Sequence, residues 1–297
     1  YGSLKETKQF VKNAGGAPAN VCVQAVKLGR EAAYLTQVGA DAFGDFLVET
    51  LQNEGGDTSH VLRSKDYDTS LAFVSFQPGG ERQFSFYRRT AADLHFTAEN
   101  FKDIAFESGD VLEFGSVALK TKQSVEAHIF LIERARAAGA VVCFDPNLRL
   151  NLWEDEEELR SVVKQFMAYA DIIKVGKDEL EFISKASSAE EAVPALFGGN
   201  LKMLLLTDSD KGAQLYTKDG LKYSLNALKV NTIDTTGAGD SFFGGFIAGF
   251  MDGGCNYDGA DLEDILRFAC KCGAYTTTNY GAIPAMGTRE IIDKAVK

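Results

Sequence analysis

The sequence is short of the features that mark membrane, disordered and disulfide-stabilised proteins. No apolar run approaches the roughly 20 residues that are needed to cross a bilayer. With only five prolines and no polar low-complexity tract, the chain is not expected to be disordered. Its five cysteines are an odd number without paired C-x-x-C spacing, so we expect buried, reduced thiols. Since no signal-peptide pattern follows Tyr1, these absences favour a cytoplasmic protein.

Positive charge is also in deficit, because 31 lysines and arginines stand against 42 aspartates and glutamates, for a formal net charge of −11. Such a molecule repels nucleic acid and anionic membranes, so neither is an expected partner. Any bound phosphate must therefore be held by local structure. A length of 297 residues suits one large α/β core with a small appendage, and we expect a single domain over residues 1–297.

Two further catalytic or metal-binding patterns are lacking. The three histidines lie too far apart to suggest a local metal site or triad, and no G-x-S-x-G motif accompanies them. The acidic run at 154–158 precedes an amphipathic pattern, so we interpret it as a helix start whose charges complement the helix dipole.

What the sequence does contain, after residue 100, is an alternation of short apolar runs with amphipathic segments. This alternation is typical of βαβ units and a parallel sheet. The pattern predicts strands over 111–115, 141–145, 171–175 and 203–207, and helices over 121–138 and 159–167. Polar residues stand in or at the ends of three of these strands, at Asp145, Lys174 and Thr207. Open α/β sheets bind their ligands at the carboxyl ends of the strands, so the active face is expected there.

Residues 70–89 break this rhythm and alternate apolar with polar side chains around Pro78-Gly79-Gly80-Glu81. The pattern predicts a two-stranded hairpin outside the main sheet. A hairpin of this kind is marginal by itself and packs on its parent domain or on a second subunit. We therefore expect a lid that doubles as the contact of a homodimer.

The strongest local signal is the run from Asp234 to Phe242, Asp-Thr-Thr-Gly-Ala-Gly-Asp-Ser-Phe, followed by an apolar helical pattern through Met251. Small residues before a helix leave backbone N–H groups unpaired, and the helix dipole adds positive charge, which together favour an anion. Asp240 lies in this turn and could accept a proton from an attacking hydroxyl. The alternative is a plain helix start with an acidic first turn. The run is neither a Walker A loop nor G-x-G-x-x-G.

A second glycine-rich turn, 14–20, precedes a helical pattern over 21–28. Gly15 and Gly16 allow a ligand to approach the backbone, and Asn20 offers donors and an acceptor to hydroxyl groups. This turn fits a sugar, or else an ordinary asparagine near a helix start.

The two turns together, in this order and about 220 residues apart, resemble the signature motifs of the ribokinase-like (PfkB) family of sugar kinases, and fructokinases most closely. The likeness continues through 38–44, the hairpin, 145–149, 174–181 and 281–284. It implies an α/β fold, a three-layer α/β/α sandwich with a mostly parallel central sheet and a small β lid. It also implies transfer of the γ-phosphoryl group of ATP to a primary sugar hydroxyl.

The resemblance assigns roles to individual residues. Asp240 is implied as the base and Gly237, Ala238 and Gly239 as the anion hole. The residues expected to face the sugar, from the resemblance or from their place after a turn or strand, are Gly15, Gly16, Asn20, Arg88, Asn147 and Arg149. Those expected on the nucleotide side are Lys174, Glu179, Thr207, Ser209, Gly212, Gly239 and Cys270.

The resemblance also implies metal ions. Glu179 matches the acidic residue of the family's N-x-x-E motif, which organises Mg²⁺ through water, but Gly176 stands where that motif has Asn. The contact of that Asn is then lost or supplied by Lys174. A potassium site beside the anion hole would use Asp234, Thr236, Thr276, Asn279, Gly281 and Ala285, mostly through backbone oxygens.

The sequence departs from the family at its start, because family members open with a strand that ends in a sugar-binding Asp, and no such strand precedes Tyr1. The expected function is that of a Mg²⁺- and ATP-dependent kinase of fructose, acting on its 6-hydroxyl. One alternative is a kinase of 2-keto-3-deoxygluconate, whose carboxylate would suit Arg88 and Arg149, or of another sugar. The other is a catalytically silent relative that only binds its ligand.

Overall fold

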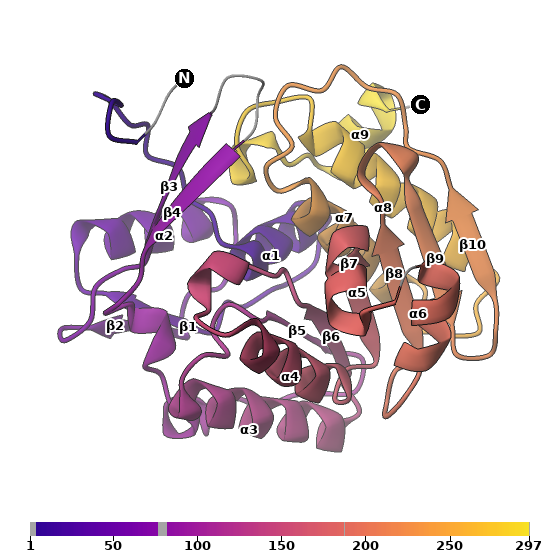
Figure 1. Cartoon of the computed structure of the whole chain (residues 1–297), viewed down its shortest axis with the longest axis horizontal. Coiled ribbons are helices and arrows are strands. Elements are labelled where there is room, and N and C mark those ends of the chain that lie inside the picture. Colours follow the sequence, from indigo (N-terminus) through magenta and orange to yellow (C-terminus); the bar gives the residue numbers. More distant parts are fainter. Residues whose placement is uncertain (1–3, 77–81, 187, 297) are drawn as a thin grey trace.

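Six strands form one sheet in the computed structural model, which describes residues 4–76, 82–186 and 188–296 (Figure 1). Their order is β10-β9-β8-β7-β6-β5, with β5 to β8 parallel and β9 and β10 antiparallel to their neighbours. The strands are β1 (Thr36–Gly39), β2 (Val61–Ser64), β3 (Leu71–Phe76), β4 (Arg82–Tyr87), β5 (Val111–Gly115), β6 (Val141–Asp145), β7 (Ile172–Gly176), β8 (Met203–Thr207), β9 (Ala213–Thr217) and β10 (Lys222–Leu225). The helices are α1 (Ala17–Lys27), α2 (Ala42–Asn53), α3 (Lys122–Ala138), α4 (Glu156–Met167), α5 (Lys177–Ser184), α6 (Ala189–Leu196), α7 (Ala238–Asp252), α8 (Leu262–Thr276) and α9 (Arg289–Ala295).

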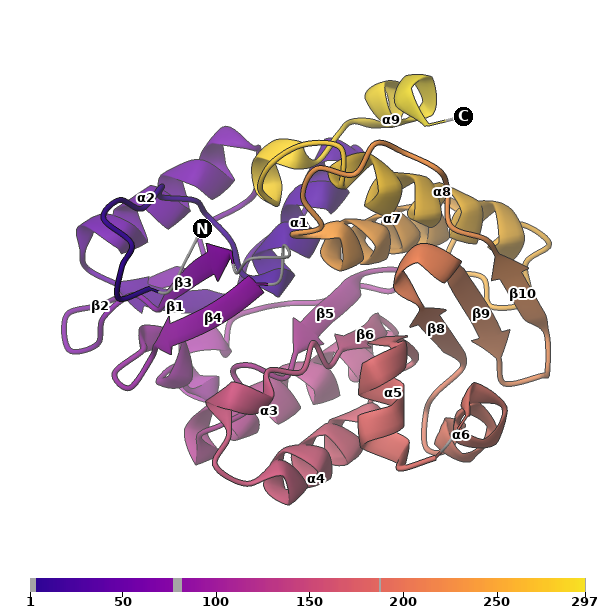
Figure 2. The same cartoon turned by 45° about the horizontal axis from the view of Figure 1, so that its top comes forward.

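Helices cover both faces of this sheet, as Figure 2 shows with α3 to α6 on one side and α1, α7 and α8 on the other. Successive strand residues point to opposite faces. In β6, for example, Val142 and Phe144 pack under α3 and α4, whereas Val141 and Cys143 pack under α7. Every residue of β6 is buried, so both faces of the strand are covered, as is usual in parallel sheets. The predicted three-layer α/β/α fold is confirmed.

The predicted elements coincide closely with the observed ones. The strands expected at 111–115, 141–145 and 203–207 have those bounds, and the strand expected at 171–175 lies one residue later. Helix α3 is capped by the Thr121 hydroxyl, which accepts from the Ser124 amide, and ends at Gly139 with φ of 80°. Helix α4 begins at Glu156 behind the capping residue Asp155, so the acidic run is a helix start.

The hairpin expected at 70–89 is present as β3 and β4, paired antiparallel with Leu71 opposite Tyr87. Its predicted turn, Pro78–Glu81, lies outside the described residues. Phe73 packs edge-on against Phe10 and Tyr87, with ring centroids 5.0 and 5.3 Å away. The hairpin stands apart from the main sheet (Figure 1), in the place of a lid.

A second small sheet, which the sequence pattern did not predict, consists of β1 and β2 in parallel. Within the described ranges, β1 pairs only with β2 and β5 pairs only with β6. Residues of both β1 and β5 line one large cleft. Among the described helices, none is long and apolar enough to cross a membrane.

Candidate active site

The start of α7 is shaped by glycine. Gly237 has φ of 76°, a left-handed conformation that other residues rarely adopt. A Cβ at this position would also lie 2.6 Å from the Cβ of Ala282, closer than two carbons can approach. Gly239 and Asp240 follow in the first helical turn, where backbone N–H groups have no carbonyl four residues earlier within the helix. The geometry agrees with an anion site at this helix start.

Asp240 is held by a residue from the other glycine-rich turn. The Asn20 side-chain amide donates to Oδ2 of Asp240 over 2.7 Å, and Asn20 is only 4% exposed. Burial raises the pKa of Asp240, while the Asn20 hydrogen bond and the charges of Lys174 and Arg149 oppose that rise. Nδ2 of Asn20 donates to Asp240, whereas the buried Oδ1 of Asn20 has no hydrogen-bond partner among the described residues. It is free to accept from a ligand hydroxyl.

A buried ion pair lies next to this carboxylate. The Lys174 ammonium is 2.9 Å from Oδ2 of Asp145, and a Cβ on Gly239 would lie 3.1 Å from Lys174 Nζ. Burial opposes the charge on Lys174, but Asp145 and Glu179 outweigh it and raise the pKa of the lysine. Burial, followed by Glu179 and Asp240, raises the pKa of Asp145 against the opposing effect of Lys174. The site thus holds a fixed cation beside the helix start.

Glu179 organises the backbone around the strand ends. Its Oε1 accepts from the Leu148 amide over 2.6 Å, and its Oε2 accepts from the Gly176 amide over 2.8 Å. Asn147 has φ of 43°, and its amide donates to Asp145 Oδ1 over 3.2 Å. The described residues contain no group of three or more His, Cys, Asp or Glu side chains that could cage a metal. Glu179 nevertheless fits Mg²⁺ held through water and phosphate oxygens, as Mg²⁺ prefers.

The lid hinge contributes a second ion pair. Arg88, directly after β4, donates to Oδ2 of Asp93 over 2.6 Å and to the Val117 carbonyl over 3.4 Å. The other oxygen of Asp93 is buried without a partner among the described residues. Sequence reasoning selected Arg88 and missed Asp93, because nothing in an Ala-Ala-Asp run marks it as a site residue. Its spacing of five residues from Arg88 was the only available signal.

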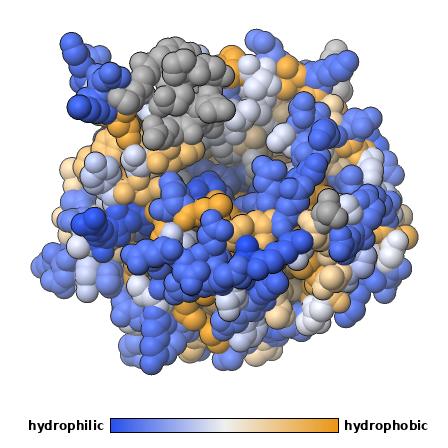
Figure 3. All heavy atoms as spheres, in the orientation of Figure 1, coloured by the Kyte–Doolittle hydropathy of each residue, from blue (hydrophilic) through white to orange (hydrophobic). Residues whose placement is uncertain are grey.

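One cleft of about 2010 Å³ brings these groups together. Its face of the molecule is hollowed near the centre, with a largely hydrophilic rim (Figure 3). Of the residues predicted from the sequence, those that line this cleft are Gly15, Gly16, Asn20, Arg88, Asn147, Arg149, Lys174, Asp234, Thr236, Gly237, Gly239, Asp240 and Gly281. Every predicted sugar-side residue is therefore in one cavity with the predicted base.

The predicted nucleotide-side residues Thr207, Ser209, Gly212 and Cys270 are not among the residues that line this cleft. Thr207 ends β8, Ser209 follows with φ of 44°, and Gly212 begins the turn into β9 with φ of 105°. Cys270 is half-buried on α8, a helix that contacts β9 and β10. Burial raises the pKa of the Cys270 thiol to about 11, so this thiol stays protonated at neutral pH.

The residues expected at a potassium site are linked by Asp234. Its Oδ1 accepts from the Thr236 amide and hydroxyl over 2.9 and 2.7 Å, and its Oδ2 accepts from the Gly281 amide over 2.9 Å. Of the other predicted members, Thr276 ends α8, Asn279 follows three residues later, and Ala285 ends a short 3-10 helix over Ile283–Ala285. Thr276 is fully buried and its hydroxyl donates to the Cys272 carbonyl. Asp234 thus ties the start of α7 to this segment.

Glu113 is an acidic residue of the cleft that sequence reasoning passed over. It lies in β5 and lines the cleft. Burial, followed by the charges of Asp145 and Asp240, raises its pKa well above the usual range. The available signal was a glutamate inside an apolar strand. The sequence pattern was interpreted as a strand, and Glu113 was given no role of its own.

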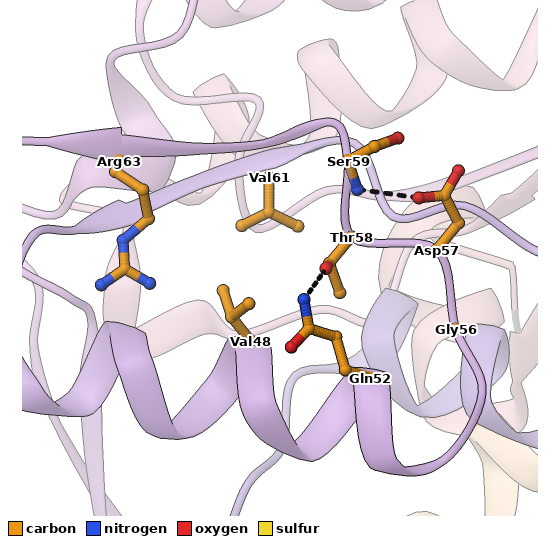
Figure 4. Close-up of a pocket in the computed structure, with 8 residues that line it drawn as sticks. All are labelled: Val48, Gln52, Gly56, Asp57, Thr58, Ser59, Val61 and Arg63. Atoms are coloured by element: carbon orange, nitrogen blue, oxygen red, sulfur yellow. Dashed lines mark hydrogen bonds between the residues drawn. The ribbon is translucent and has the colours of Figure 1, made fainter.

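A smaller pocket of about 540 Å³ lies between α2 and β2 (Figure 4). Its polar groups mainly form hydrogen bonds or ion pairs with one another or with nearby residues. Gln52 donates to the Thr58 hydroxyl over 2.8 Å, the Ser59 amide donates to Asp57, and Arg63 pairs with Asp45. We assign no chemistry to this pocket.

The large cleft combines the half-buried carboxylate of Asp240, a helix start that favours an anion and the buried ammonium group of Lys174. This is the arrangement of an enzyme that transfers a phosphoryl group to a hydroxyl. Residues 1–289 match the model of the pfkB family of carbohydrate kinases. The chain belongs to that family, and it is a phosphotransferase that acts on a sugar hydroxyl.

Known proteins resemble the chain along nearly its whole length. The chain is 40% identical over 288 residues to fructokinase-2 of Solanum lycopersicum. The alignment covers 96% of this chain and 88% of that protein. A fructokinase structure from Vibrio cholerae O395, bound to fructose, ADP and calcium, superimposes with a TM-score of 0.91 at 31% identity. That match covers 98% of this chain and 93% of the other. Aminoimidazole riboside kinase from Salmonella enterica matches with a TM-score of 0.87 at 29% identity, over 97% and 93% of the two chains.

Proposed function

We propose that this protein is an ATP-dependent fructokinase that transfers the γ-phosphoryl group of ATP to the 6-hydroxyl of fructose. The observation that carries the proposal is the half-buried carboxylate of Asp240, held by Asn20 over 2.7 Å at the start of α7. The likeness to plant and bacterial fructokinases over nearly the full chain supports fructose as the substrate.

In the proposed reaction, Asp240 accepts the proton of the 6-hydroxyl as the sugar oxygen bonds to the γ-phosphorus. The bond from that phosphorus to the β–γ bridging oxygen breaks, and ADP leaves with the electron pair. Charge that develops on the transferring group would lie at the start of α7, beside Gly237, Ala238 and Gly239, where the helix start favours it. Mg²⁺, when bound, neutralises the phosphate oxygens, and Glu179 would hold its water.

The sugar would lie among Gly15, Gly16, Asn20, Arg88, Asn147 and Arg149, which share the large cleft. The unpartnered oxygens of Asn20 and Asp93 are suited to accept hydrogen bonds from sugar hydroxyls. The nucleotide would extend from Lys174 toward Thr207, Ser209, Gly212 and Cys270. Potassium bound near Asp234 would add positive charge beside the anion hole.

A 2-keto-3-deoxygluconate kinase is the second candidate. The ion pair of Arg88 with Asp93 argues against it, because a guanidinium already neutralised by a carboxylate attracts a sugar acid weakly. The deciding experiment measures ADP release from Mg-ATP with fructose, ribose, adenosine, 2-keto-3-deoxygluconate or no sugar. Turnover that depends on fructose supports the proposal, and a preference for the sugar acid overturns it.

We also propose a cytoplasmic homodimer that associates through the hairpin. All five cysteines are free, as a reducing compartment would keep them. The hairpin exposes Val74 and Tyr87, which are 38% and 67% exposed, and Phe10 beside it is 52% exposed. Light scattering tests the dimer, and a monomer at micromolar concentration would exclude it.

A further inference from the structure

The Lys174–Asp145 pair is unusually buried for two charges. The side chains are 9% and 2% exposed, and they come from the neighbouring strands β7 and β6. Burying a charged pair costs solvation that an apolar pair would not lose. A lysine in this position therefore calls for a reason beyond the stability of the sheet.

The position of the ammonium group supplies that reason. Lys174 Nζ lies so close to Gly239 that a Cβ there would be 3.1 Å away, and Lys174 lines the large cleft. An ammonium has three N–H donors, and Asp145 takes one of them over 2.9 Å. The remaining donors lie beside the first turn of α7, where the backbone already favours an anion.

The neighbouring residue on the same face of β7 strengthens this argument. Side chains two positions apart in a strand point to the same side, so Lys174 and Gly176 share a face. Gly176 has no side chain with which to reach a phosphate. Lys174 is therefore the residue of β7 that can deliver a polar group to the transferring phosphoryl oxygens.

We propose that Lys174 is a catalytic residue, whose ammonium donates hydrogen bonds to the transferring phosphoryl group, and that Asp145 is the positioning residue that holds it. This inference rests on the proposed kinase reaction. Lys174 stays protonated throughout, because the hydroxyl proton passes to Asp240 and the electron pair of the broken bond leaves with ADP.

Asp145 has a second effect, on the charge of the lysine. Burial alone would lower the pKa of Lys174, and the carboxylates of Asp145, Glu179 and Asp240 raise it instead. Glu113, on β5, interacts with the same lysine, which opposes the rise that burial causes in the pKa of Glu113. Asp145 has the largest of the effects that raise the pKa of Lys174.

The test compares Lys174→Met, which keeps the length and removes the charge, with Lys174→Arg and with the control Lys202→Met. Lys202 also pairs with a buried aspartate, Asp171, over 3.2 Å. It directly precedes β8 and is not among the residues that line the large cleft. We expect Lys174→Met to lower kcat about 100-fold or more, with the KM for fructose and the affinity for ADP within about threefold of wild type. Lys174→Arg should recover part of kcat, and Lys202→Met should keep it.

Asp145→Asn tests the positioning role through the pH dependence of activity, which a purely structural role would leave unchanged. Activity needs the charged lysine, so it falls as pH rises through the pKa of Lys174, and removal of Asp145 should bring that fall to lower pH. The double variant Lys174→Met with Asp145→Leu removes both charges, and if the pair were only structural it would recover wild-type kcat.

Recovery of kcat in the double variant, or near-normal kcat in a folded Lys174→Met protein, would overturn the inference. Thermal melting of each variant distinguishes a loss of folding from a loss of catalysis. If wild type itself turns over none of the sugars, the proposed function fails instead, and the two failures are separate.

Discussion

The side-chain amide of Asn20 lies 2.7 Å from Oδ2 of Asp240, across a separation of 220 residues. Each residue sits on a helix that starts at a glycine with positive φ, Gly16 at 117° and Gly237 at 76°. The contact joins the predicted sugar-binding turn to the predicted base. The position of a sugar and the orientation of the base therefore depend on each other.

Removal of the base should abolish catalysis and spare the fold. Asp240→Asn keeps the shape of the side chain but cannot accept the proton, so we expect kcat to fall about 10²–10⁴-fold, with ATP affinity and melting temperature nearly unchanged. The matched control is Asp252→Asn at the other end of α7, where Asp252 pairs with the surface residues Arg30 and Arg289. Near-normal turnover by Asp240→Asn would remove Asp240 from the mechanism.

The contact with Asn20 should be visible in the pH dependence. Burial raises the pKa of Asp240 and the Asn20 hydrogen bond lowers it. The ionised carboxylate is the active form, so activity is lost as pH falls through that pKa. Asn20→Ala removes the lowering effect, and the acid limb of kcat/KM should move to higher pH. The control Asn200→Ala, at a residue that bonds only the Ala168 carbonyl, should leave the limb in place, and an unmoved limb in Asn20→Ala would contradict the assigned contact.

The turn before α7 should not tolerate a side chain. In Gly237→Ala the new Cβ would meet Ala282 at 2.6 Å in a left-handed backbone, and such strain costs about 1–3 kcal/mol. We expect a lower melting temperature and a lower kcat. Gly254→Ala is a control with similar backbone, φ of 71°, and open space around the Cβ. It should lose stability without the added clash, and if the two variants behave alike, the contact with Ala282 carries no cost.

Monovalent cations should stimulate the enzyme through the segment that Asp234 organises. Asp234 holds the Thr236 and Gly281 amides over 2.9 Å each. We expect wild-type turnover to be several-fold faster in potassium chloride than in choline chloride at equal ionic strength, and Asp234→Ala to lose that difference. Equal wild-type rates in the two salts would exclude a potassium site.

Local sequence signals were enough to predict four of the six strands of the main sheet and the helix behind the Gly237 turn. The helix expected from residue 21 begins earlier, at Ala17, and β9 and β10 were not predicted. The strand of residues 141–145 is buried on both faces. Gly16 and Gly237 have positive φ angles, which favour glycine at these turns. Apolar runs and special backbone conformations leave marks within a few residues of sequence.

Pairwise contacts between distant residues left no such mark. Asp93 completes an ion pair with Arg88, and Glu113 lines the cleft from inside a strand, yet each is an isolated acidic residue in the sequence. The parallel pairing of β1 with β2 was missed as well, because four-residue strands around α2 carry little periodicity. These features depend on tertiary packing, which a single sequence does not display.

The edges of β1 and β5 that have no strand partner allow further strand pairing. Over the described residues, each edge carries a row of backbone N–H and C=O groups without a strand partner. Unpaired edges of this kind are templates on which an extended peptide can add a strand. An extended segment that pairs with the edge of β5 would add a further strand to the main sheet.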